Sequence, residues 1–471
     1  MSFDVAVLGG GPAGMAAATE AARRGARVLL LEESPAPGGQ VYRAPPPGFV
    51  IKPDSDARAG NALRAALAAS GAEVRTGCRV WGVGGGALVA AGVAPAPFRL
   101  DALAPDGSSF HVESRALVVC AGTHERIIPF PGWTLPGVMG LAAATILMKA
   151  QGVLPGRRVV VAGAGPLLFA VAWKLVKAGA KVAAVVDLAT SGEWARALPA
   201  LAARPDLLAR GMGWRAGLRA QGVPVLAGAR IAAAEGNAVL ERVRVAERAF
   251  DCDALCIGHG LVPATEATRT FRATHRYATG DGGWVPVLDQ DGRCSVPFLY
   301  AAGDGAGIRG AAAAPDAGRL AALAALHDLG LLDGPSHAVA RAIPARAHAR
   351  AARAGAAMAR MMALRPVLVA AIPPDTVVCR CEGVTRAEIE AACTDGATDM
   401  NQLKQFTRCG MGPCQGRLCG EAAAELVAMR VGGREKVGFA TGRLPLRPVA
   451  MDALLGEFDY ADIPVPAAAP I

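Results

Sequence analysis

The chain has 471 residues, of which 52% are hydrophobic and 19% charged, with a mean hydropathy of +0.32. This composition excludes a disordered chain, and the length suffices for roughly three domains, each with its own core. The formal charge of +9 comes from cations scattered along the chain rather than from a basic block, so no nucleic-acid-binding footprint is expected.

The first residues lead directly into an apolar segment, with no basic stretch and no cleavage site before it. We therefore expect no secretory signal and a cytoplasmic location. No uncharged apolar run reaches the roughly 18 residues that a transmembrane helix needs. The eleven cysteines are accordingly expected to be thiols or metal ligands rather than disulfides, because the cytoplasm is reducing.

A strand, a glycine-rich turn, a helix and a second strand are predicted within residues 4–31. Gly9, Gly11 and Gly14 have the spacing of a dinucleotide fingerprint, in which a diphosphate approaches the backbone at a helix N-terminus. Glu32 follows the second strand, where a carboxylate can bind an adenosine ribose. The cofactor-binding residues expected here are Gly9, Gly11, Pro12, Ala13, Gly14, Glu32, Glu33, Gly39 and Gln40. A loop is predicted at residues 45–48, where Gly and Pro cluster.

The same order of elements recurs over residues 157–187. Gly163 and Gly165 are present, but Leu168 occupies the third glycine position, which prevents the close helix-strand approach of a standard NAD site. Asp187 could still bind a ribose and would disfavour a 2′-phosphate. Two interpretations stay open: a site for NAD or another adenine nucleotide, and a retained fold with an empty site.

A third segment points to FAD in particular. Residues 296–305 form an aromatic and β-branched strand that ends in Gly-Asp, and the carboxylate of Asp304 can hold a ribityl hydroxyl. The helix expected over residues 310–329 would direct its positive end at the flavin ring. The further flavin-binding residues expected are Ala121, Gly122, Gly303 and Asp304.

A predicted helix over residues 338–365 leads through a Pro-containing linker to five closely spaced cysteines. A C-x-C pair and a C-x4-C pair beside a flavin site indicate an iron-sulfur cluster, with a capping box at Thr385 and Glu388 opening a helix between them. A structural zinc site and a metal-free relic are the alternatives. The ligands expected are Cys379, Cys381, Cys414 and Cys419, with Cys409 left over. Core thiols are expected at Cys78, Cys120, Cys252, Cys256, Cys294 and Cys393.

Residues 1 to about 340 resemble the two-dinucleotide-domain flavoproteins that include glutathione and thioredoxin reductases. The strings at 123–126 (Thr-His-Glu-Arg), 129–139 and 441–449 narrow this to the α-type subunits of heteromeric bacterial dehydrogenases. That group includes opine (octopine and nopaline) oxidases, hydrogen cyanide synthase, D-hydroxyproline and proline dehydrogenases, and sarcosine oxidase. The cysteine segment resembles the [2Fe-2S] domain of bacterioferritin-associated ferredoxin (BFD) type.

The resemblance implies an α/β fold with two Rossmann-like domains, of FAD and NAD(P) type, plus a small helical BFD-like [2Fe-2S] domain. It implies a subunit that carries FAD and a cluster, receives electrons from a β-type flavoprotein that oxidises a secondary amine or imino acid, and passes them to a quinone or other acceptor. It is compatible with a small third subunit, and with a peripheral contact with the inner membrane through that acceptor. The domain boundaries expected are 1–125 and 263–335 (FAD), 126–262 (NAD(P)-like), 336–374 (linker), 375–432 (cluster) and 433–471 (tail).

Two other functions remain open: a self-contained NADH-dependent reductase with the cluster as electron exit, and a subunit that mainly supports its partner. Disulfide-reductase chemistry is not expected, because no reactive cysteine pair lies in the loop after Gly39 or in the second unit. No catalytic residue is predicted. His124, Glu125 and His259 are polar loop residues with a structural role as the simpler interpretation.

Overall fold

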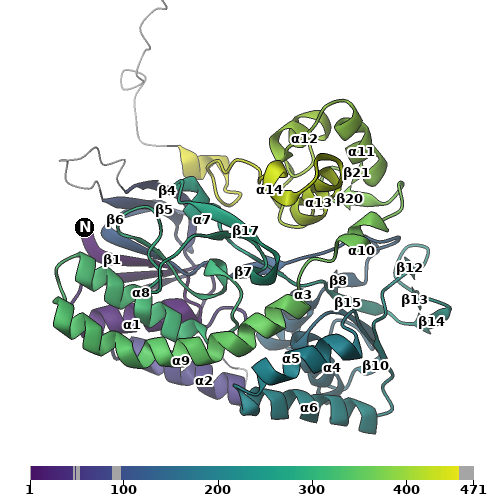
Figure 1. Ribbon diagram of the computed structural model, residues 1–471, viewed down its shortest axis with the longest axis horizontal. Coiled ribbons are helices and arrows are strands. Elements are labelled where there is room, and N and C mark those ends of the chain that lie inside the picture. The colour runs from purple at the N-terminus through teal and green to yellow at the C-terminus, as the bar shows by residue number, and fades with distance from the viewer. Residues whose placement is uncertain (1, 46–47, 49–53, 87–96, 456–471) are drawn as a thin grey trace, which may run out of the picture.

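The computed structural model describes residues 2–45, 48, 54–86 and 97–455. The predicted loop at 45–48 and the predicted tail beyond residue 455 lie partly outside these ranges. Two α/β units lie side by side, and a helical C-terminal unit lies above them (green to yellow in Figure 1). Among the described helices, none has both the length and the apolar character needed to cross a bilayer.

The first unit is built on a sheet of order β3-β2-β1-β6-β5-β4. Its strands are β1 (Ser2–Leu8), β2 (Val28–Glu32), β3 (Glu73–Thr76), β4 (Arg79–Gly85), β5 (Phe98–Leu103) and β6 (Ser109–Val119). β19 (Leu299–Ala301) returns from far along the chain to pair with β6 in parallel. α1 (Pro12–Arg23) packs against α2 (Ser55–Ala68) and α8 (Ala314–Asp328). β2 is buried along its whole length, which agrees with the continuous apolar run at residues 28–31.

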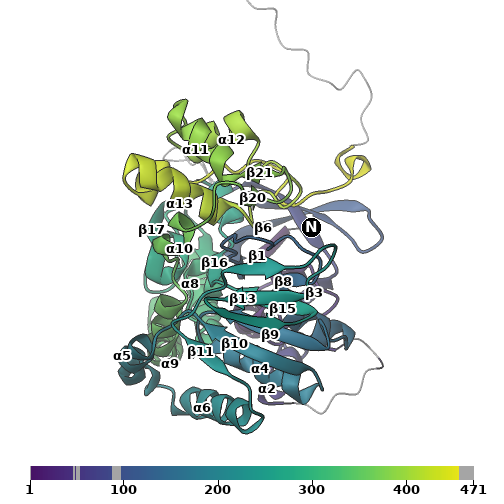
Figure 2. The same ribbon diagram turned by 90° about the vertical axis from the view of Figure 1, so that its right-hand side faces the viewer.

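The second unit has a wholly parallel sheet of order β11-β10-β9-β15-β8, seen nearly face-on in Figure 2. Its strands are β8 (Val138–Gly140), β9 (Arg158–Gly163), β10 (Lys181–Asp187), β11 (Val225–Ala227) and β15 (Ala254–Gly258). Its helices are α3 (Leu141–Ile146), α4 (Pro166–Lys177), α5 (Ser191–Leu201) and α6 (Pro205–Ala220), and an antiparallel sheet β12 (Ala233–Glu235), β13 (Arg242–Val245) and β14 (Arg248–Asp251) flanks it.

Two chain crossings join the units where β7 (Thr123–Glu125) pairs with β16 (Leu261–Pro263). α7 (Glu266–Thr270) and the hairpin β17 (His275–Ala278) and β18 (Gly283–Pro286) follow. The helix predicted over 338–365 is α9 (Gly334–Met361), which begins earlier because the Asp333 side chain caps it. α9 packs against α8 of the first unit and α5 of the second, and so runs along both (Figure 1).

The C-terminal unit follows α10 (Pro366–Ala370). It contains β20 (Val377–Cys379), β21 (Val384–Thr385), α11 (Arg386–Thr394), α12 (Met400–Thr407), α13 (Gly420–Val431) and α14 (Arg434–Val437). The predicted capping box is confirmed, because Thr385 and Glu388 exchange side-chain and backbone hydrogen bonds at the start of α11. The side chains of Ile389, Leu403 and Val427 are fully buried in its separate core.

Candidate functional site

A cavity of about 430 Å³ opens in front of the first glycine turn. Twelve of the thirteen residues predicted from the sequence for FAD line it: Gly9, Gly11, Pro12, Ala13, Glu32, Glu33, Gly39, Gln40, Ala121, Gly122, Gly303 and Asp304. Gly14 lies behind the turn, where an added Cβ would lie 1.8 Å from the carbonyl oxygen of Gly9. Residues from three distant parts of the sequence therefore converge on one cavity, and Gly14 allows the turn to pack.

The turn leaves room for a phosphate. A Cβ on Gly11 would meet no atom within 4 Å, so the N-terminus of α1 faces open space. The backbone N–H groups of Gly10 and Ser34 donate to the two oxygens of Glu32, at 2.6 and 2.7 Å. Glu32 is thereby fixed at the cavity wall, where its remaining lone pairs can accept ribose hydroxyls.

Asp304 contributes a further carboxylate to the wall of the cavity. The N–H groups of Arg309 and Gly310 both donate to its Oδ1, at 2.8 and 2.7 Å, which leaves Oδ2 for a hydroxyl donor. Burial raises the pKa of Asp304 above its usual value. The donors and open space of the cavity fit a ribityl chain here and a diphosphate at the turn.

The cavity also contains residues that the sequence analysis missed. Arg43 comes from the loop after Gln40, Arg417 from the loop between the last two cysteines, and Arg447 from the C-terminal segment. Burial lowers the pKa of Arg417. The Glu266 carboxylate, 2.9 Å from its guanidinium group, raises this pKa, and the positive charge of nearby Arg447 lowers it. No local motif marks these arginines, because only the folded chain brings them together.

Cys78 and Cys120 also line this cavity, but they are not a reactive pair. Burial raises the pKa of both thiols, that of Cys120 to about 12, and neither is in a disulfide. Both sulfurs therefore stay protonated near neutral pH and are poor nucleophiles. Their environment agrees with the expectation of core thiols and gives no support to disulfide-reductase chemistry.

The second glycine turn differs sharply from the first. A Cβ on Gly165 would lie 2.7 Å from Cγ of Met362, the residue directly after α9, so a side chain of the protein occupies the space before α4. Asp187 is 1% exposed, and its two oxygens accept hydrogen bonds from Ala189 N–H and Trp194 Nε1–H, each at 2.9 Å. The carboxylate predicted to bind a ribose is thus already hydrogen-bonded within the protein. Of the two interpretations left open, this geometry favours the empty site.

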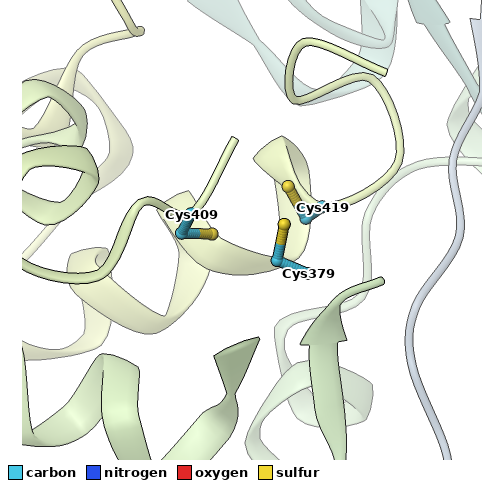
Figure 3. A group of neighbouring side chains, drawn as sticks. All are labelled: Cys379, Cys409 and Cys419. Atoms are coloured by element: carbon cyan, nitrogen blue, oxygen red, sulfur yellow. The ribbon is translucent and has the colours of Figure 1, made fainter. Parts of the chain in front are cut away.

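Three of the five clustered cysteines have their sulfurs within 4.8 Å of one another: Cys379, Cys409 and Cys419 (Figure 3). They come from β20, from the loop after α12 and from the residue before α13, and all are buried. Hydrogen bonds with Cys409 and Cys419 lower the pKa of Cys379 to about 2. A buried thiolate among other thiols is an environment suited to metal ions.

The other two cysteines lie on the outer side of this group. Cys414 interacts with both Cys419 and Cys381, and its hydrogen bond with Cys419 is the main cause that lowers its pKa to about 5. Cys381 is exposed, and a Cβ on Gly412 would lie only 2.2 Å from its Cβ, so this loop requires glycine. All five thiols therefore form one group, including Cys409, which the sequence analysis had set apart.

Of the polar residues near the join between the units, His259 is buried, and His124 and Glu125 are partly buried. Burial lowers the pKa of His124 and of His259 to about 4, so both imidazoles are neutral. Burial raises the pKa of Glu125 to about 7, against the hydrogen bond that it accepts from Ala142 N–H at 2.7 Å. Glu125 caps the start of α3, which supports the structural role expected for it.

Comparison with known proteins agrees with this architecture. Residues 3–321 match the model of the pyridine nucleotide-disulphide oxidoreductase family, and residues 377–429 match the BFD-like [2Fe-2S] binding domain. The chain belongs to the pyridine nucleotide-disulphide oxidoreductase family. The protein is therefore an oxidoreductase with FAD and a [2Fe-2S] cluster as its cofactors, and the predicted fold class is confirmed.

Similar proteins extend over nearly the whole chain. An opine oxidase subunit of Agrobacterium tumefaciens (strain Ach5) is 38% identical over 96% of this chain and 91% of its own length. Hydrogen cyanide synthase subunit HcnB of Pseudomonas aeruginosa is 35% identical over 96% of this chain and 98% of its own length. The crystal structure of L-proline dehydrogenase from P. horikoshii has the same fold, with a TM-score of 0.69 and 21% identity over 97% of this chain and 80% of that chain. The resemblance predicted from the sequence is confirmed.

Proposed function

We propose that this chain is the electron-transfer subunit of a heteromeric dehydrogenase that oxidises a secondary amine or imino acid of the opine, proline or D-hydroxyproline type. A β-type flavoprotein would hold the substrate, and electrons would leave toward a quinone or other acceptor. A bound FAD accepts electrons in pairs, and a [2Fe-2S] cluster passes them on singly.

The observation that carries this proposal is the direct link between the flavin cavity and the cysteine group. Arg417 lines the cavity and lies between Cys414 and Cys419 in the sequence, so one short loop touches both sites. At the second turn, in contrast, the Met362 side chain lies against Gly165 and leaves no room for an added Cβ. This contrast supports a relay whose electrons leave through the cluster over a reductase that takes electrons from NADH.

The relatives support a partner and a substrate class. The opine oxidase and hydrogen cyanide synthase relatives are by their names subunits, which implies further chains in each enzyme. We extend this to the present chain and place substrate oxidation on the partner, because the sequence predicts no catalytic residue in this chain. A cytoplasmic location accompanies the proposal.

We propose Cys379, Cys381, Cys414 and Cys419 as the cluster ligands. Cys379 interacts with Cys409 and Cys419, and Cys414 interacts with Cys419 and Cys381. Each iron of a [2Fe-2S] cluster needs two thiolates, which the four proposed residues supply. The sulfur of Cys409 lies within 4.8 Å of the sulfurs of Cys379 and Cys419, so Cys409 is the alternative ligand. Cys414→Ser should abolish the cluster signal in electron paramagnetic resonance, Cys409→Ser should retain it, and Cys393→Ser is the control because that thiol is half-buried in the helical core.

The function is tested by isolating the tagged chain from its own cells. We expect a second flavoprotein to co-purify, and the complex to reduce an artificial acceptor with a secondary amine or imino acid as donor. Complex carrying Cys414→Ser should still bleach its partner flavin with substrate but lose acceptor reduction. A chain that is isolated alone and oxidises NADH with the same acceptor would contradict the proposal.

A further inference from the structure

We propose that residues 438–449 and the cysteine loop close the flavin cavity, and that Arg43 and Arg447 neutralise the diphosphate of FAD. The iron-sulfur unit would then complete the FAD site, and loading FAD would fix that unit in its docked position. This inference goes beyond the electron-transfer function and does not depend on the identity of the partner or substrate.

The C-terminal segment is held from both sides. The Leu446 N–H donates to the carbonyl of Trp81 in β4, at 2.7 Å, which attaches the segment to the first unit. From the cysteine loop, Gln415 Nε2 donates to Pro445 O at 3.0 Å, and Arg417 Nη2 donates to Leu446 O at 2.9 Å. The segment thus lies between β4 and the cysteine loop, with Leu446 and Arg447 at the cavity wall.

The wall of the cavity combines three arginines with the carboxylates of Glu32, Glu33, Glu266 and Asp304, and two of the arginines have no carboxylate partner in the described part of the chain. Arg417 is paired with Glu266, and Glu33 with Arg79 at 3.1 Å. Within the described residues, neither Arg43 nor Arg447 forms an ion pair. Arg43 reaches only the neutral oxygens of Ser34 and Gln40, at 3.4 and 3.3 Å, and its buried Nε has no partner.

These two arginines match the chemistry of the diphosphate. Each phosphate of FAD carries one negative charge, and α1 adds only the partial positive charge of its N-terminus. Two unpaired guanidinium groups at the wall of the cavity supply the missing counter-charge as charge-assisted hydrogen bonds. A bound diphosphate would add a contact to Arg447 and would therefore hold the segment more firmly in its docked position.

The direct test is the affinity of the flavin-free full-length protein for FAD, followed by quenching of flavin fluorescence. Arg447→Gln and Arg43→Gln should each weaken binding by about tenfold, the value of one charge-assisted hydrogen bond. Arg447→Lys should recover part of it. Arg443→Gln is the matched control, because Arg443 is exposed four residues earlier and does not line the cavity; it should change the affinity less than twofold.

Two further measurements separate the diphosphate from a general effect on folding. Riboflavin has no phosphate, so its affinity should be the same for the wild type and for Arg447→Gln. Hydrogen exchange of the peptide around Leu446 should slow when FAD is added to the wild type, and slow less in Arg447→Gln. Equal FAD affinity of Arg447→Gln and Arg443→Gln would overturn the proposal. So would a loss of riboflavin affinity in Arg447→Gln as large as its loss of FAD affinity.

Discussion

The two nucleotide-binding units share a strand, a glycine turn, a helix and a second strand, yet they offer a ligand opposite surroundings. In the first unit the turn at Gly11 faces a cavity, and Glu32 holds the turn with lone pairs to spare. In the second, Met362 fills the space at Gly165, and Asp187 is already bonded to Trp194. The difference shows that a fingerprint predicts the turn, whereas the residues packed opposite decide whether a nucleotide fits.

We expect the largest loss of FAD binding and stability when the third glycine of the first turn is replaced, as it is by Leu168 in the second turn. Gly14→Ala would place a Cβ 1.8 Å from the Gly9 carbonyl, a backbone clash that α1 can relieve only by moving away from β1. We expect the purified variant to retain no FAD and to unfold at lower denaturant concentration. Gly213→Ala, in α6 with no atom within 4 Å of the added Cβ, should keep FAD and unfold at an equal or slightly higher denaturant concentration, because alanine favours the helix.

The reverse change opens the second turn. Met362→Ala should lower the free energy of unfolding by roughly 2–4 kcal/mol, because it leaves a cavity among Ala164, Ile308 and Ala359. NADH should still fail to bind in a fluorescence titration, since Asp187 stays bonded to Trp194. Met212→Ala, at a 62% exposed position, should be neutral. Tight NADH binding by Met362→Ala would show that Met362 alone closes the site.

A smaller effect is expected at the carboxylate of the second unit. Trp194→Phe keeps the aromatic contact with Phe169 but removes the N–H that donates to Asp187. The buried carboxylate then loses a partner, and we expect a loss of about 1–3 kcal/mol in urea unfolding. Adding Asp187→Asn to this variant should restore part of the stability by removing the charge. If Trp194→Phe were fully stable, Asp187 would be free for another ligand.

The smallest effect concerns Glu125, where the two units join. Its pKa is raised from 4.5 to about 7 in the folded protein, so folding favours the protonated form. Its contribution to stability is therefore complete below pH 4.5 and is lost as pH rises toward 7. Glu125→Gln should remove this slope and gain about 1–2 kcal/mol at pH values of about 8. Parallel stability curves for the two proteins between about pH 5 and 8 would contradict this assignment.

The sequence predicted both βαβ units and the capped helix after Thr385, because each follows from local spacing. The return of residues 296–305 to the first unit was predicted from the family resemblance, since no local pattern specifies a pairing with a distant strand. Twelve residues expected at the flavin site also line one cavity. Arg43, Arg417, Arg447 and the filling of the second turn by Met362 could not be predicted. They depend on where α9 and the C-terminal segment dock, and no local pattern encodes that contact. The relation of Cys409 to the other thiols likewise depends on the fold of a loop.

The central claim is that electrons reach this flavin from a partner and not from NADH. Anaerobic stopped-flow mixing of the FAD- and cluster-loaded chain tests it directly, with absorbance followed for the flavin and the cluster. We predict that excess NADH leaves both oxidised for minutes, while dithionite reduces both, which proves that the cofactors are competent. Bleaching of the flavin by NADH within milliseconds, followed by reduction of the cluster, would contradict the account.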